Sequence, residues 1–186
     1  GEVRQYTGDY INTSELMRMD PASYHSIVFL GSDWMTSKEE ADARTVWGQY
    51  LLRHLLGSRN PSPHILLELF DPENESLLQG SGCEIITTPV LLSHMVAHVA
   101  LRPELNPIFY QLLVSGGTEI AFRWAGEYGL QQGEWSFAEI QSAVGGYGDI
   151  ALGIRLRGRA EAELNPNRQR RLDLSPRDEI VVLSTD

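Results

Sequence analysis

The stretch from His64 to Leu113 reads HILLELFDPENESLLQGSGCEIITTPVLLSHMVAHVALRPELNPIFYQLL. A short apolar run at 65–69 leads into an acidic turn and a short helix, and a second apolar run follows at 84–87. A long apolar helix is then predicted from Pro89. Short strands that alternate with helices are typical of a parallel sheet. We interpret the stretch as the closing half of a doubly wound fold, whose ligands lie at the carboxyl ends of the strands.

The sequence before this stretch continues the same alternation. We predict a strand at 2–7, a helix that begins near Thr13, a strand at 26–30 and a helix at 38–56 that ends before Gly57. The predicted fold class is therefore α/β, a partial doubly wound parallel sheet. A glycine-rich phosphate loop is absent from the sequence, so we expect the first strand and this loop to be missing from the sheet.

The composition changes after Gly117, which predicts a domain boundary. Residues 1–115 are expected to form the closing part of a Rossmann-like, nucleotide-binding-type domain, and residues 118–186 a small α+β module. In the second part, 118–124, 150–156 and 179–183 read as strands, and 157–171 reads as a polar hairpin or loop. Ser136 and Glu139 fit a capping box at the start of a helix.

Charge and composition exclude several classes of function. The 186-residue chain has a formal net charge of −10, which argues against a nucleic-acid partner, because binding to a phosphate backbone needs a basic face. Lys38 is the only lysine and lacks the glycines of a phosphate loop. Cys83 is the only cysteine, so a disulfide within the chain and a multi-cysteine zinc site are both excluded. No nucleophile, base and orienting group share a recognisable motif, so no catalytic residue is predicted.

Candidate ligand-binding residues lie at or near the ends of the predicted strands. A carboxylate in this position can bind a ribose hydroxyl or a hard cation such as calcium. The alternative is that these acidic turn residues cap helices and face water. The candidates are Asp9, Ser32, Asp33, Glu68 and Asp71.

Two further clusters have both a functional and a structural interpretation. His94 and His98 are one helical turn apart and can share a metal, but no third ligand can be named, so packed or interface histidines are favoured. The one basic patch can hold an anion or an acidic neighbouring subunit, although a solvated loop is favoured. It comprises Arg155, Arg157, Arg159, Arg168, Arg170 and Arg171.

The order of these elements resembles the cytosolic regulatory region of the Castor and Pollux ion-channel family, which is related to the domains that regulate potassium conductance. The resemblance rests on Gly8-Asp9, SIVFLGSD (26–33), HILLELFDPEN (64–74) and CEIITTPVLLSHMVAHVALRPELNPIF (83–109) in the first part of the chain. In the second part it rests on WSFAEI (135–140), DIALGIRL (149–156), ELNP (163–166) and DEIVVLS (178–184).

The resemblance implies a regulatory (gating) domain on the cytoplasmic side of a membrane. It also implies an upstream pore domain and assembly into a dimer or a larger ring. It leaves the ligand open, with a nucleotide or calcium as candidates in the full-length protein. Because the phosphate loop is missing, we expect this chain to bind NAD weakly or not at all. The alternative is a fragment of a nicotinamide-dependent oxidoreductase.

The helix from Pro89 to Leu101 is apolar nearly all round, whereas a helix packed on one side needs only an apolar stripe. We therefore predict self-association through this helix or through the helix at Asn106–Val114.

Overall fold

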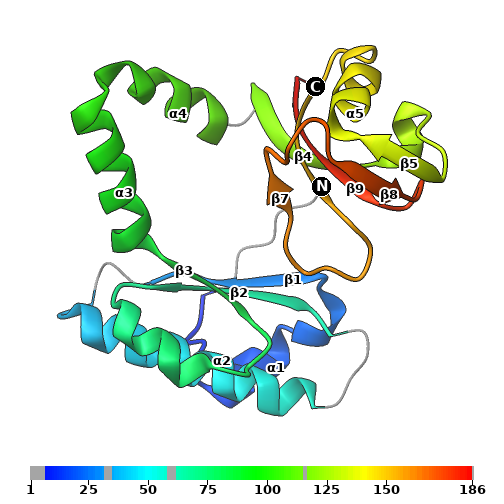
Figure 1. Cartoon of the computed structure of the whole chain (residues 1–186). Coiled ribbons are helices and arrows are strands. Elements are labelled where there is room, and N and C mark those ends of the chain that lie inside the picture. Colours follow the sequence, from blue (N-terminus) through cyan, green and yellow to red (C-terminus); the bar gives the residue numbers. More distant parts are fainter. Residues whose placement is uncertain (1–6, 32–34, 58–61, 115–116, 186) are drawn as a thin grey trace. The chain divides into compact units, whose positions relative to one another are not determined.

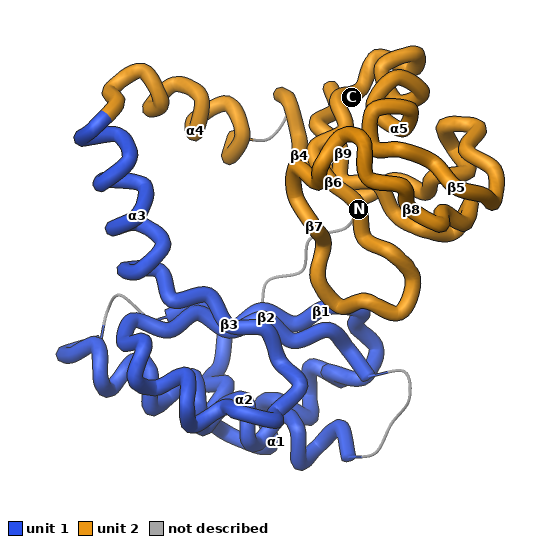
Figure 2. Tube along the Cα trace, viewed as in Figure 1, with its two compact units in different colours: residues 1–101 blue, residues 102–186 orange. Residues whose placement is uncertain are grey.

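A computed structural model describes residues 7–31, 35–57, 62–114 and 117–185. The predicted strand at 2–7 lies almost entirely outside these residues, as do Ser32 and Asp33. The chain divides into two compact units, Gly1–Leu101 and Arg102–Asp186 (Figure 2). The predicted boundary at 115–118 lies further along the chain. Because Ser115 and Gly116 are outside the described residues, that boundary stays a prediction.

The first unit contains a three-stranded parallel sheet in the order β1-β2-β3 (Figure 1). The strands are β1 (Ser26–Phe29), β2 (His64–Leu69) and β3 (Glu84–Thr87). They alternate with α1 (Thr13–Arg18), the 3-10 turn η1 (Pro21–Ser23), α2 (Lys38–Leu56), the 3-10 helix η2 (Pro72–Leu78) and α3 (Thr88–Leu101). The predicted α/β class is confirmed.

One face of this sheet packs on helix α2 and forms the core of the unit. Buried leucines of α2 meet alternate side chains of the strands, because successive side chains of a strand point to opposite faces. The buried members are Phe29, Leu52, Leu56, Ile65, Leu67, Leu69 and Leu78. Helix α2 begins after Ser37, whose hydroxyl accepts from Glu40 N at 3.1 Å, and ends before Gly57, which has a φ of 60°.

The opposite face of the sheet is exposed in the part of the chain that the structure describes. Val28 and Leu30 are 53% and 67% exposed, and Ile86 on β3 is 41% exposed. Together with Leu66 they line a shallow pocket of about 160 Å³. Parallel sheets are normally buried on both faces, so this face lacks one covering layer within the described residues.

Helix α3 likewise buries none of its side chains. Its sequence is TPVLLSHMVAHVAL, and Leu91, Leu92, Val96 and Leu101 are all more than half exposed. None of the helices in the described parts of the chain is both long and apolar enough to cross a bilayer.

The second unit is an α+β module with an antiparallel sheet in the order β4-β9-β6-β7 and a separate ribbon of β5 and β8. After η3 (Pro103–Leu105) and α4 (Asn106–Leu113), its elements are β4 (Thr118–Trp124), η4 (Ala125–Tyr128), β5 (Gly133–Ser136), α5 (Phe137–Gly145), β6 (Ile150–Arg155), β7 (Glu163–Leu164), β8 (Arg171–Leu174) and β9 (Glu179–Thr185).

The core of the second unit lies between α5 and one face of these strands. Phe137, Ile140 and Val144 of α5 are fully buried against Ile180 and Val182 of β9. The predicted capping box at the start of α5 is confirmed. Glu139 N donates to Ser136 Oγ at 3.3 Å, and Ser136 N donates to Glu139 Oε2 at 2.7 Å. The Ser136 hydroxyl also donates to Glu139 Oε2 at 2.7 Å, and this bond, followed by the one from Ser136 N, holds the pKa of Glu139 below its usual value.

Candidate functional site

Glu68 lies at the carboxyl end of β2 and joins the ends of all three parallel strands. Its Oε2 accepts from Gly31 N, just after β1, at 2.9 Å. Its Oε1 accepts from the hydroxyl of Thr88, the first residue of α3, at 2.5 Å. Both carboxylate oxygens are therefore engaged. A ligand at this carboxylate either uses a remaining lone pair of one oxygen or displaces the Gly31 N–H or the Thr88 hydroxyl.

Gly31 allows the end of β1 to come this close. A Cβ added at Gly31 would lie 2.3 Å from Cε2 of Phe70. Any larger residue would therefore have to push the Phe70 ring aside at the carboxyl end of β2. This close approach helps to place the Gly31 N–H on Glu68.

Asp71 lies two residues after β2 and caps a helix. Helix capping was the alternative interpretation of the candidate acidic residues. Its Oδ1 accepts from Glu73 N at 2.9 Å and so caps η2. The Asp71 side chain also lines a pocket of about 440 Å³ between α2 and η2. A cap and a pocket wall are compatible, because the carboxylate has further lone pairs.

Asp42 of helix α2 lines this pocket and holds its wall in place through three hydrogen bonds. It was not among the predicted site residues. It is 1% exposed, and its carboxylate accepts from Phe70 N at 2.8 Å, Asp71 N at 2.9 Å and Asn74 Nδ2 at 2.8 Å. The sequence contains a signal for it. Asp42, Thr45, Gln49 and Leu52 are spaced three or four apart, so a polar residue occupies the buried face of a predicted helix.

The same pocket has an aromatic wall. The Trp47 and Tyr50 rings stack with centroids 5.4 Å apart and an interplanar angle of 19°, and Leu77 lies with them in the lining. Glu39 stands at the rim, where backbone and Ser37 hydrogen bonds lower its pKa. The pocket therefore combines carboxylates with apolar rings.

The other predicted site residues do not join Glu68 and Asp71 in the described contacts. Asp9 accepts from Ile11 N at 3.2 Å and forms an ion pair with Arg44 Nη2 of α2 at 2.6 Å. Ser32 and Asp33 lie outside the described residues. Among the described residues, no three His, Cys, Asp or Glu side chains come together to hold a metal ion.

Several arginines of the predicted basic patch are paired with acids in the second unit. Arg155 Nη2 lies 2.6 Å from Glu179 Oε2, Arg170 Nη1 lies 2.7 Å from Glu163 Oε1, and Arg171 Nη1 lies 3.3 Å from Glu139 Oε2. Much of the positive charge at these three positions is therefore balanced within the chain.

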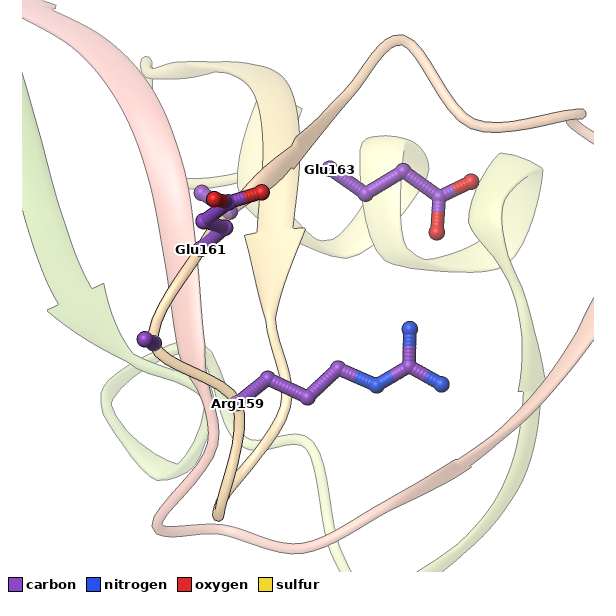
Figure 3. Close-up of a pocket in the computed structure, with 5 residues that line it drawn as sticks. Arg159, Glu161 and Glu163 are labelled. Atoms are coloured by element: carbon purple, nitrogen blue, oxygen red, sulfur yellow. The ribbon is translucent and has the colours of Figure 1, made fainter.

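The loop between β6 and β7 surrounds an open pocket of about 540 Å³ lined by residues 159–163 (Figure 3). Figure 3 shows the side chains of Arg159 and Glu163 extending to the same side of the loop. Its charged lining consists of one base, Arg159, and two acids, Glu161 and Glu163, so both signs of charge are present.

No family model matches the chain. Over 103 residues, 55% of its length, the chain is 30% identical to the ion channel CASTOR of Lotus japonicus and covers 12% of that protein. Over 120 residues, 64% of its length, it is 26% identical to the probable ion channel POLLUX of Arabidopsis thaliana and covers 15% of it. The chain is similar to the Castor and Pollux ion channels. The resemblance predicted from the sequence is confirmed, and it concerns a small part of each relative.

Among solved structures, the human SLO3 gating ring matches with a TM-score of 0.72 at 14% identity, covering 97% of this chain and 36% of that one. At this identity the match establishes the fold alone. The chain therefore shares the fold of part of that gating ring, and this fold begins with a Rossmann-like parallel sheet. Both curated relatives are named as ion channels and neither as an enzyme.

Proposed function

We propose that this chain is a ligand-responsive regulatory domain that controls the gate of an ion channel from the cytoplasmic side of the membrane. The similarity to CASTOR and POLLUX carries the proposal, and the gating-ring fold supports it. The pore lies in another part of the full-length protein. No catalytic step is assigned to the chain.

The contacts of Glu68 suggest how a ligand acts. Thr88 begins α3, and its hydroxyl is bonded to Glu68 at the sheet edge where doubly wound folds bind ligands. A cation or a ribose hydroxyl that displaces the Thr88 hydroxyl from Oε1 of Glu68 releases the first turn of α3. The ligand shifts the population from one position of this helix to the other. The difference between its affinities for the two states sets the size of the shift.

The two uncovered apolar surfaces of the first unit fit an assembly. The exposed face of the parallel sheet, around Val28 and Ile86, matches the place of the other half of a doubly wound domain. Helix α3, with no buried side chain, matches a subunit contact in a dimer or larger ring. Exposed apolar patches of this kind mark interaction sites.

Single-channel recording of the full-length protein tests the proposal. Glu68→Gln should change the open probability and leave the single-channel conductance unchanged, because the change lies in a gate-controlling domain and not in a pore. Glu73→Gln is the matched control, since its exposed side chain has no described partner. A changed conductance, or an unchanged open probability with Glu68→Gln, would contradict the proposal.

The rival function, part of a nicotinamide-dependent oxidoreductase, has a separate test. The missing glycine-rich loop would leave the pyrophosphate without its backbone donors. Calorimetry is therefore expected to show weak NAD binding or none. Micromolar affinity for NAD would favour the oxidoreductase.

A further inference from the structure

The second unit contains a pocket whose lining is strongly cationic although the chain is acidic. It has a volume of about 360 Å³, and its charged lining consists of Arg155, Arg157, Arg159 and Arg177 with a single acid, Glu179. The formal net charge of the whole chain is −10. Four arginines around one cavity therefore create a local field opposite to that of the rest of the molecule.

The register of three paired strands places several of the side chains that line this pocket. Trp124 of β4 pairs with Glu179 of β9, and Glu179 pairs with Arg155 of β6, so the three side chains form a row across neighbouring strands. Arg155 is held twice in this row. Its guanidinium pairs with Glu179 at 2.6 Å, and it lies 4.4 Å from the centroid of the Phe122 ring on β4. These two contacts hold the Arg155 side chain in place along the wall of the cavity.

A buried aspartate fixes the two loops that bear the other arginines. Asp178 is 4% exposed, and its carboxylate accepts from Arg157 N at 2.6 Å and from Ser175 N at 2.7 Å. The first bond anchors the loop after β6, and the second closes the turn between β8 and β9 that contains Arg177. Both Asp178 oxygens accept from the backbone, so this carboxylate holds the two loops in place.

Unlike the Arg155 guanidinium and the Asp178 carboxylate, the guanidinium groups of Arg157 and Arg177 have no partner among the described residues. Both side chains are exposed, and among the described residues neither guanidinium forms an ion pair or a side-chain hydrogen bond. A planar guanidinium matches the oxygens of a phosphate with two parallel hydrogen bonds. Trp124, 51% exposed, adds a flat apolar wall to the same cavity.

We propose that this pocket binds a phosphate-bearing ligand, with Arg157 and Arg177 contacting the phosphate and Arg155 completing the cationic wall. The phosphate belongs either to a free small molecule or to a lipid headgroup, because both present the same oxygens. The site lies wholly in the second unit and does not depend on the contacts of Glu68.

Calorimetric titration of the 186-residue chain with inorganic tripolyphosphate tests the site. The double variant Arg157→Gln/Arg177→Gln should bind at least about tenfold more weakly, since it loses two charge-assisted contacts. The control Arg102→Gln/Arg168→Gln removes the same charge from exposed positions outside the pocket and should bind within about twofold of the parent chain. Equal weakening in both variants would overturn the proposal, because it would reflect net charge alone.

Flotation with phosphatidylcholine vesicles, with and without phosphatidylinositol bisphosphate, identifies the source of the phosphate. Binding to the phosphoinositide vesicles alone, lost in Arg157→Gln/Arg177→Gln, assigns a lipid headgroup. Binding to tripolyphosphate alone assigns a free ligand. Binding to neither overturns the proposal. The Trp124 indole NMR signal gives a second readout, which should shift on tripolyphosphate addition in the parent chain and in the control. An unchanged signal during tight binding would place the ligand elsewhere.

Discussion

In the first unit, Glu68 connects the carboxyl ends of the parallel strands through its side chain. One carboxylate accepts a backbone N–H from the end of β1 and a hydroxyl from the start of α3. An amide in its place has only one oxygen, which can accept from Gly31 N, and its NH2 group can donate to the Thr88 hydroxyl, so both bonds would lose the carboxylate charge. The carboxylate therefore makes both bonds at this edge charge-assisted, which are stronger than the bonds of a neutral amide.

We expect Glu68→Gln to lower the free energy of unfolding by about 1–2 kcal/mol, because two hydrogen bonds to a charged group become bonds to a neutral amide. Urea denaturation followed by circular dichroism measures it. Glu73→Gln should change the value by less than about 0.5 kcal/mol, as exposed substitutions usually do. Equal effects of the two variants would show that the Glu68 bonds add nothing to stability.

Asp149, next to β6, gives a prediction about pH. Its Oδ2 accepts from Tyr128 Oη at 2.6 Å. That hydrogen bond, followed by one from Ser184, holds the pKa of Asp149 below its ordinary value. Burial and the Asp149 bond in turn raise the pKa of Tyr128. A depressed carboxyl pKa stabilises the folded state above the unfolded-state pKa of about 3.9, and this stabilisation is lost as the pH falls through the folded-state value.

Unfolding experiments between about pH 6 and pH 3 should show this linkage. Asp149→Asn and Tyr128→Phe should each lose less stability on acidification than the parent chain. Asp173→Asn, an exposed control without a described partner, should follow the parent. If Asp149→Asn lost as much stability as the parent, Asp149 would not be the group that titrates.

At the scale of the elements, helix α3 differs from α2, the other long helix in the described chain. Helix α2 buries seven of its residues, whereas α3 buries none. An apolar helix without an intramolecular partner is stable in water only if something else covers it.

Val96→Lys should reduce self-association of the chain, because a charge in a desolvated contact costs several kcal/mol unless it is paired. Light scattering should give at least twice the 20.8 kDa chain mass for the parent and a lower mass for the variant. Met17→Lys, an exposed apolar position of α1, is the control and should keep the parent mass. A monomeric parent at high concentration would contradict the prediction.

The elements differ in how well the sequence predicted them, for physical reasons. Helix α2 was predicted at its observed bounds because both of its ends carry local signals, Ser37 and Gly57. Strands β5 and β8 were missed because neither contains a run of apolar residues, and their pairing of Trp135 with Leu172 is a contact between segments far apart in sequence. Asp42 was missed as a site residue for a similar reason, since its three donors lie about thirty residues away.

At the scale of the whole molecule, the chain has two separate cores. The core of the second unit draws its residues from 121–182 and includes none from 102–117. The stability of this unit is therefore expected to come from the segment after Gly117, and not from α4, which has no buried side chain.

Two fragments, 118–186 and 102–186, decide between the possible domain boundaries. We expect both to fold, with free energies of unfolding within about 1 kcal/mol of each other, because the shorter one keeps the whole core. Hydrogen exchange of the amides in α5 and β9 measures it. If 118–186 were unfolded and 102–186 folded, the boundary would lie at Arg102 and the predicted one would be wrong.

The bare face of the parallel sheet also affects how the purified chain behaves in solution. Charges of one sign keep copies apart, and here the net charge is −10. Added salt shortens the range of this repulsion, to about 3 Å at 1 M, and leaves the attraction between apolar faces intact. The purified chain should therefore be less soluble in concentrated salt than in dilute buffer, and purification steps that precipitate or salt out the protein will favour sheet-to-sheet aggregates over the native assembly.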